Sequence, residues 1–192
     1  MTTETLRPNA DGTASPYPWF IYPVSPTTHY DKVDDVTPDE DSTFISTAED
    51  LTPRVDRFLK PSSSIPDGAT NITVKMYMRC KRVYDANPVA PNAYQGLYID
   101  AVEYYAPSFN PVDAYADYSY EWTKNPATSG DWTKAVIDAM ELACKGTSNR
   151  KTVGGIIYYT SINCTQVWIV ISYTVAGVQQ HIGDGLTFAT NG

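Results

Sequence analysis

The stretch Thr165-Gln166-Val167-Trp168-Ile169-Val170-Ile171-Ser172-Tyr173-Thr174-Val175 is the clearest structural signal in the sequence. Every second side chain on one side of this segment is apolar, namely Val167, Ile169, Ile171 and Tyr173. The opposite side is also apolar, through Trp168 and Val170. A strand that is apolar on both faces is typical of the centre of a sheet. We therefore expect residues 165–175 to form the central strand of a β-sheet.

Shorter segments with a period of two surround this strand, and turn residues separate them. The most regular is 70–80, whose predicted inward set is Ile72, Val74, Met76, Met78 and Cys80. In a second segment, 116–123, the side chains on one face are Tyr118, Tyr120 and Trp122. Further strands are predicted at 94–105, 30–36, 42–47, 55–59 and 186–189.

One helix is predicted, at about residues 133–145, because apolar side chains recur there at helical spacing: Val136, Ile137, Met140 and Ala143 or Cys144. Thr133 is a natural N-cap and Gly146 a natural stop. About eight short strands without alternating helices predict a mainly β fold, an antiparallel β-sandwich or jelly roll. Its core is expected between about residue 42 and residue 176.

The composition excludes several classes of protein. With 42% hydrophobic and 19% charged residues among 192, the chain is neither disordered nor a coiled coil. It has no apolar run of transmembrane length, and its polar start is not typical of a signal peptide, so we expect a protein made in the cytoplasm with no membrane partner. The net charge of −8 disfavours nucleic acid as a partner.

The acidity is concentrated in residues 31–56, which hold nine acids against two bases. Four of these acids offer oxygen ligands for Ca²⁺, namely Asp34, Asp35, Asp39 and Asp41. Their spacing lacks the D-x-D-x-D-G order, and Pro38 interrupts the segment. The alternatives are an acidic turn that leads into a strand, or a surface that pairs with arginine on a neighbouring molecule.

Proline separates the start of the chain from the rest, since five of the 14 prolines fall in the first 30 residues. Closely spaced prolines are not compatible with a helix or with a central strand of a sheet. We predict an extended N-terminal arm, 1–30, followed by a single domain, 31–192. The expected contacts of the arm with a partner subunit are Leu6, Arg7, Trp19, Phe20 and Tyr22. The alternative is that the arm packs along its own domain.

No pattern typical of catalysis is found. The histidines are His29 and His181, and the sequence has neither zinc-ligand spacing nor a glycine-rich phosphate loop. Three cysteines, Cys80, Cys144 and Cys164, do not predict a disulfide framework. We expect a protein that is not an enzyme and has no cofactor apart from the possible calcium.

Tyrosine is abundant, and one group suggests a ligand. Five aromatic residues suggest a platform on which a sugar could stack, namely Tyr94, Tyr98, Tyr104, Tyr105 and Trp122. Tyrosine is also a good strand former and is enriched at protein interfaces, so these residues equally fit a sheet surface.

Four segments together carry a resemblance to a known group of proteins: 5–9 (TLRPN), the acidic 31–45, 120–139 with its Asn125-Pro126 loop, and 164–170 (CTQVWIV). In order and spacing they resemble β-sandwich structural proteins of tailed phages and related viruses. The sequence departs from that pattern at Val136, where a capping-box Glu is expected.

The resemblance implies a non-enzymatic virion structural protein, either a capsid decoration protein or another shell or tail component. It also implies a location in the virion and partners that are copies of the chain itself and other virion proteins. The alternative function is a carbohydrate-binding β-sandwich module of the adhesin or fibre type.

Overall fold

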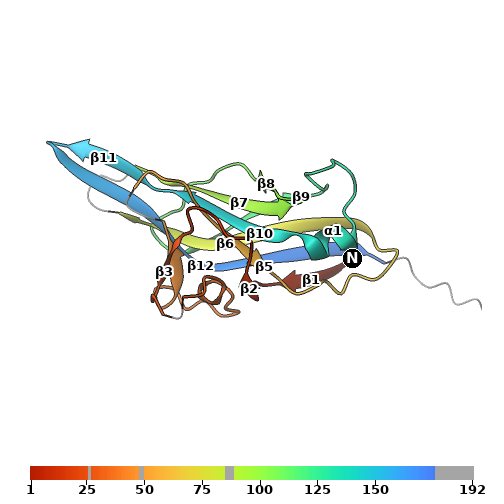
Figure 1. The fold of residues 1–192 in the computed structure, drawn as a ribbon. Helices are drawn as coiled ribbons and strands as arrows, with labels where there is room; N and C mark the ends of the chain where they lie inside the picture. The colour runs from red at the N-terminus through yellow and green to blue at the C-terminus, as the bar shows by residue number, and fades with distance from the viewer. Residues whose placement is uncertain (26, 48–49, 85–88, 176–192) are drawn as a thin grey trace, which may run out of the picture.

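The computed structural model describes residues 1–25, 27–47, 50–84 and 89–175, and within them two antiparallel sheets form a β-sandwich (Figure 1). Sheet A contains β1 (Thr2–Leu6), β3 (Phe20–Tyr22), β4 (Phe44–Ser46), β6 (Thr70–Tyr84), β9 (Ala116–Trp122), β11 (Asn149–Val153) and β12 (Ile156–Thr174). Sheet B contains β2 (Ala10–Asp11), β5 (Arg54–Leu59), β7 (Asn92–Ile99), β8 (Val102–Tyr105) and β10 (Glu141–Thr147). The helical elements are α1 (Lys134–Ala139) and the 3-10 helix η1 (Tyr30–Lys32). The prediction of a mainly β, antiparallel sandwich is thus confirmed.

Strand β12 is the centre of sheet A, as the two-sided apolar pattern predicts. One edge of β12 pairs with β6 over residues 160–174. The other edge pairs in turn with β11, β4 and β1. The 19 residues of β12 begin nine positions before the predicted start at 165, so the strand is longer than we expect from the sequence.

The core lies between the two sheets and contains the predicted inward side chains. In β6 the set Ile72, Val74, Met76, Met78 and Cys80 is buried, and in β12 so are Val167, Ile169, Ile171 and Tyr173. Sheet B contributes Phe58, Ala93, Leu97, Ile99, Leu142 and Cys144 to the same cluster. Alternation along each strand therefore decides which side chains enter the core.

The predicted helix 133–145 is correct only in its first half. The Thr133 side chain accepts a hydrogen bond from the Val136 backbone N–H, as an N-cap does. The helix ends at Ala139, and Glu141–Thr147 becomes β10, paired on one side with β5 and on the other with β7. As an internal strand of sheet B, this segment forms backbone hydrogen bonds along both of its edges, which a short helix at the surface would not. Gly146 is consequently not a helix stop but part of a strand.

Two predicted strands also differ from the structure. Segment 94–105 is divided into β7 and β8 by a two-residue turn at Asp100 and Ala101, whose φ angles are 50° and 64°. Segment 30–36 begins with η1 because the Asp11 carboxylate accepts the N–H groups of His29 and Tyr30 at 3.0 and 2.7 Å. Segments 42–47, 55–59 and 116–123 contain β4, β5 and β9, whereas 186–189 lies outside the described residues.

The N-terminal 30 residues are part of the sandwich and not a separate arm, which corrects our division at residue 30. Strand β1 pairs with β12 in sheet A, β2 pairs with β5 in sheet B, and β3 pairs with β4. Leu6 and Trp19, predicted as partner contacts, are instead buried in their own chain at 7% and 2% exposure. The Trp19 indole N–H donates to the Cys144 carbonyl at 3.2 Å.

In the part of the chain that the structure describes, no helix is long and apolar enough to cross a membrane.

Candidate functional site

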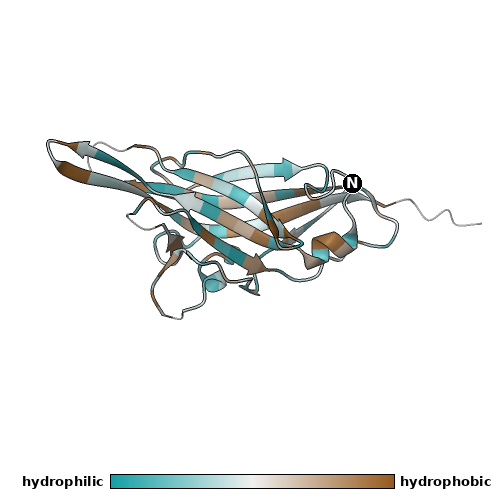
Figure 2. Cartoon of the chain, turned by 45° about the horizontal axis from the view of Figure 1, so that its top comes forward, coloured by the Kyte–Doolittle hydropathy of each residue, from teal (hydrophilic) through white to brown (hydrophobic). Residues whose placement is uncertain are grey.

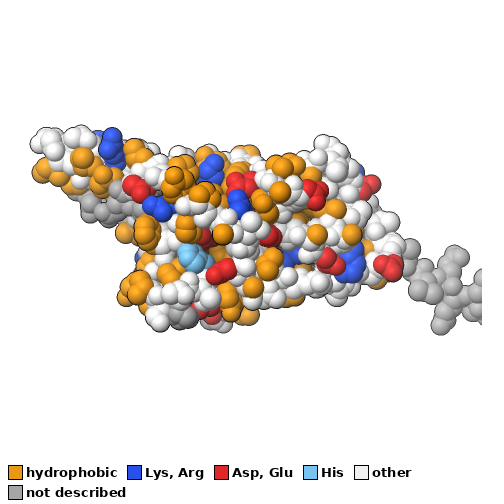
Figure 3. All heavy atoms as spheres, in the orientation of Figure 1, with side chains coloured by type: hydrophobic (Ala, Val, Ile, Leu, Met, Phe, Trp, Pro, Cys, Tyr) orange, Lys and Arg blue, Asp and Glu red, His pale blue; other side chains and the backbone are white. Residues whose placement is uncertain are grey.

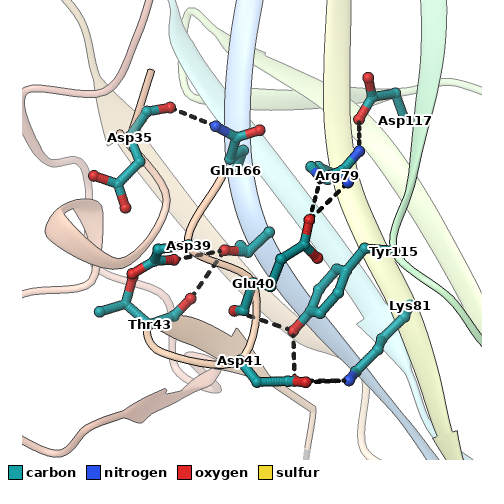
Figure 4. Close-up of polar contacts among 11 residues, drawn as sticks. Asp35, Asp39, Glu40, Asp41, Thr43, Arg79, Lys81, Tyr115, Asp117 and Gln166 are labelled. Carbon is teal, nitrogen blue, oxygen red and sulfur yellow. Dashed lines mark hydrogen bonds and ion pairs between the residues drawn. The ribbon is translucent and has the colours of Figure 1, made fainter. Parts of the chain in front are cut away.

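Residues 31–43 of the acidic segment lie over the outer face of sheet A, where several of their acids pair with cations of the same chain (Figure 4). The Glu40 carboxylate accepts hydrogen bonds from the Arg79 guanidinium at 2.7 and 3.1 Å, and Asp117 binds the same guanidinium at 2.9 Å. Asp41 accepts from the Lys81 ammonium at 2.8 Å, which lowers the pKa of Asp41. We predicted an arginine partner on a neighbouring molecule, whereas the arginine that Glu40 contacts is Arg79 of the same chain.

The four predicted calcium ligands do not converge on one point. The two oxygens of Asp39 accept hydroxyl groups of Thr43 and Thr165 at 2.7 and 3.1 Å, whereas the carboxylate of Asp41 faces Lys81. Asp35 contacts Gln166 through its backbone carbonyl at 2.6 Å, and its carboxylate lies apart from that of Asp41 (Figure 4). Among the described residues, no group of three or more His, Cys, Asp or Glu side chains is placed to hold a metal ion.

We expect calcium to leave the melting temperature of the protein unchanged. A ligand that binds only the native state adds stability that grows with the ratio of its free concentration to its Kd, and the four predicted ligands here do not converge on one point. Thermal melting in millimolar Ca²⁺ and in excess chelator measures the effect. A saturable rise with Ca²⁺ that is reversed by chelator would contradict this prediction.

Asp34 and Asp35, like Asp39, form no salt bridge within the described residues. Burial, and for Asp34 also the charge of Asp35, raises the pKa of these carboxyl groups. Arg7 is the cation that acts on both, and its guanidinium lies over the Trp168 ring at 5.2 Å. Val36 follows them in the chain and is 80% exposed. Negative charge and an exposed apolar side chain thus lie together on this face.

The predicted tyrosine platform is present only in part. Tyr94, Tyr98 and Tyr105 lie on the outer face of sheet B, whereas Tyr104 faces the other way and packs against the core. The Tyr105 ring covers Gly96, where a Cβ would lie 2.6 Å from the ring. Trp122 is on β9 of sheet A and is buried at 8% exposure.

Cations of the same chain lie against the rings of this platform. The Lys145 ammonium is 5.1 Å from the centre of the Tyr94 ring and 4.8 Å from that of Tyr105. The Arg57 guanidinium lies 4.3 Å from the Tyr98 ring centre and is paired with Glu103. These ring faces are therefore engaged in cation–π contacts and are less open to a sugar than the sequence suggests.

A pair formed by the half-buried His29 and the buried Asp56 is a feature that the sequence did not reveal. His29 Nδ1 lies 2.7 Å from Asp56 Oδ2, and the Trp19 backbone N–H donates to the other oxygen of Asp56 at 3.1 Å. Asp56 is 5% exposed and borders a cavity of about 200 Å³ that also contacts Asp11. Because Asp56 lies on β5, its bonds to His29 and to the Trp19 N–H fasten the N-terminal segment to sheet B.

This pair predicts that stability falls as the pH rises above neutrality. The hydrogen bond from His29 to Asp56 raises the pKa of His29, and the charges of Asp11 and Asp31 act in the same direction. A raised histidine pKa adds stability that is complete below about pH 6.5 and is lost as the pH passes the folded-state value. We expect a loss of about 1 kcal/mol by pH 8.5.

Urea unfolding of wild type and of His29→Gln between pH 5.5 and 8.5 measures this loss. The variant should lack the wild-type slope across this range, since glutamine does not titrate. Equal slopes in the two proteins would show that another group is responsible.

The three cysteines are free thiols buried in the core. Cys80 and Cys164 lie opposite each other on β6 and β12, and Cys144 is on β10 of the other sheet. Burial raises the pKa of Cys80 and Cys144 well above the ordinary value, which keeps these thiols protonated. They pack as small apolar side chains, as predicted for Cys80 and Cys164.

A further exposed apolar feature is the hairpin of β11 and β12, which was not expected from the sequence. Residues 149–159, which we call the ribbon, extend beyond the rest of the sandwich (Figure 1). Strand β6 ends at Tyr84, opposite Thr160, so residues 156–159 pair only with β11 within the described chain. The residues from 150 to 157 are all exposed.

Both faces of the ribbon combine apolar, aromatic and basic side chains. One face carries Val153, Ile156, Tyr158 and Lys151, and the other carries Ile157, Tyr159 and Arg150. Ile156 and Ile157 are 58% and 45% exposed. Figure 2 shows the apolar end of the ribbon, and Figure 3 shows basic side chains beside it. The signal in the sequence is Gly154-Gly155 between apolar residues, a pattern typical of a two-residue hairpin.

Of the other predicted arm contacts, Phe20 and Tyr22 are exposed on the edge strand β3, at 53% and 52%. Each already has a partner in the chain, since Arg54 lies over the Phe20 ring at 4.7 Å and Tyr22 stacks on Phe44 at 4.9 Å. The structure therefore leaves Phe20 and Tyr22 accessible at one edge of sheet A, separate from the buried Leu6 and Trp19.

No family model matches the chain, and no curated protein matches it in sequence.

Proposed function

We propose that this protein is a non-enzymatic structural component of a virion, a capsid decoration protein or another shell or tail component. The observation that carries the proposal is the ribbon. A two-stranded hairpin gains little stability by itself in water, and this one leaves two isoleucines exposed at its end. Such a projection is typical of an element that is covered by another protein molecule. The resemblance of the sequence to phage β-sandwich proteins supports a virion as the assembly.

A second line of support is the arrangement of the body. The sandwich is closed by the N-terminal strands and held at its surface by paired charges such as Arg79–Glu40 and Lys81–Asp41. The ribbon has no comparable partner among the described residues. A rigid body with one projecting apolar element is what a subunit needs in order to join a shell or tube. Carbohydrate binding stays an alternative prediction, based on Tyr94, Tyr98 and Tyr105.

Two substitutions in the ribbon test the proposal. We expect Ile156→Asp/Ile157→Asp to keep the wild-type melting temperature, because both side chains are exposed, and to lose self-association or attachment to particles. Sedimentation velocity and co-sedimentation with the particles of the encoding virus measure these properties. Val102→Asp, at a site 49% exposed on β8, is the matched control and should assemble normally.

The outcome that contradicts the proposal is a wild-type protein that stays monomeric at all concentrations and is absent from purified particles. Binding of an oligosaccharide that is lost in Tyr98→Ala would then favour the carbohydrate-binding alternative.

A further inference from the structure

The charge of the ribbon indicates what covers it. Residues 149–159 contain Arg150 and Lys151 and no acid, so the ribbon carries +2. Since the whole chain carries −8, the remaining residues carry −10. The positive charge of the ribbon is therefore complementary to the negative charge of the rest of the chain. A second copy of this chain is therefore a partner of suitable charge.

Two ribbons do not complement each other. Contact between the ribbons of two copies would bring two Arg150 and two Lys151 side chains together with no acid between them. Like charges at an interface cost free energy and disfavour that register. The complementary contact is therefore between the ribbon of one copy and the body of another.

The body offers one face that combines negative charge with exposed apolar surface. A shallow depression of about 540 Å³ is lined by residues 5–9, Val36 and Pro61. Asp34 and Asp35 precede Val36 in the chain and have no salt bridge within the described residues. Most other acids of the segment are occupied, for example Glu40 by Arg79 and Asp41 by Lys81. Asp34 and Asp35 are thus acids of the segment that no salt bridge holds, and Arg7 in the lining of the depression is the cation that acts on both.

The ribbon cannot reach this face within one molecule. Arg7, in the lining of the depression, lies over Trp168, which is 12 residues along β12 from Ile156. At about 3.3 Å per residue, the end of the ribbon is roughly 40 Å from Trp168 along the same strand. A contact between the two surfaces must therefore join separate molecules.

We propose that the ribbon of one copy binds the Asp34–Val36 face of the next copy, with Arg150 and Lys151 against Asp34 and Asp35. The isoleucines at the end of the ribbon then cover Val36 and the adjacent depression. This inference rests on the proposed structural function and adds the partner and the mode of contact. The two surfaces in contact are different, so the contact repeats from head to tail. Repetition of such a contact produces a closed ring or an open helical array, the geometries from which tubes and shells are built.

Charge reversal on each side of the contact tests the inference in the full-length protein. We expect Arg150→Glu/Lys151→Glu and Asp34→Lys/Asp35→Lys each to weaken self-association at least tenfold in sedimentation equilibrium. An equimolar mixture of the two variants should associate again, because each ribbon then meets a face of opposite charge. Association of the wild type should weaken as salt is raised from 50 to 500 mM.

Matched controls separate this contact from the effects of net charge and of folding. Asp67→Lys/Glu121→Lys makes the same change in net charge at two exposed positions and should associate as wild type does. Val36→Lys changes a position of the proposed face that is 80% exposed, and it should weaken association without altering the melting temperature. If Asp34→Lys/Asp35→Lys does not fold, Val36→Lys is used in its place.

The outcomes also distinguish this inference from the proposed function. Wild-type association of both charge-reversed variants would overturn the inference and leave the structural function standing. Loss of association in each variant without recovery in the mixture would show that the ribbon binds another surface, which also overturns it. A monomeric wild-type protein that is absent from particles would overturn the inference together with the proposed function.

Discussion

Deletion of residues 1–28 should leave a chain that does not fold cooperatively. The deletion removes β1, whose five residues pair with Ile169–Tyr173 of the central strand, and it removes Trp19 from the core. Loss of a buried tryptophan alone costs about 3–5 kcal/mol, against a total stability of about 5–15 kcal/mol for a domain. We expect no thermal transition in near-UV circular dichroism and poor dispersion in a proton–nitrogen NMR spectrum.

A milder substitution keeps this prediction testable if the deleted protein is insoluble. Trp19→Ala should lose about 3–5 kcal/mol in urea unfolding, since it also leaves the Cys144 carbonyl without its indole donor. Phe20→Ala, at the adjacent position with 53% exposure, should lose much less. A truncated protein that melts like the wild type would mean that the N-terminal strands are accessory to the fold.

Ile169→Asp should prevent soluble folding. Ile169 is fully buried in β12 and lies between Leu6 of β1 and Met76 of β6. A carboxylate at this position would be buried without a partner, and the cost of several kcal/mol approaches the whole stability of a domain. Soluble yield and thermal melting of the purified protein measure the effect.

The neighbouring position provides a control for this prediction. Val170 points to the outer face of sheet A, opposite Lys75, so Val170→Asp places its charge next to a cation and near solvent. We expect Val170→Asp to fold with a moderately lower melting temperature. If Ile169→Asp and Val170→Asp behaved alike, the assignment of the inward face of β12 would be wrong.

The sequence predicted the candidate surfaces to different extents. The acidic segment is visible in the sequence as a concentration of charge, but the pairing of Glu40 with Arg79 joins residues 39 positions apart and needs the folded chain. The tyrosines of β7 are visible in the sequence as an aromatic group, whereas the cations Lys145 and Arg57 that lie against their rings come from β10 and β5. The ribbon had a signal in Gly154-Gly155, which becomes informative only when the strands on both sides are known to leave the sheet.

Sequence alone determined the strands whose pattern is local. In 70–80, alternation of apolar and polar side chains specifies the inward face without reference to any other segment, because successive residues of a strand point to opposite faces. In 165–175, apolar side chains on both faces specify a central strand in the same local way. The structure decided those segments whose conformation depends on distant partners. Residues 141–147 fit a helix by spacing but form β10 because β5 and β7 supply backbone hydrogen bonds on both edges. Residues 1–30 join the sandwich because β12 offers an open edge to β1 and sheet B offers Trp19 a hydrogen-bond acceptor, neither of which can be inferred from the proline-rich segment itself.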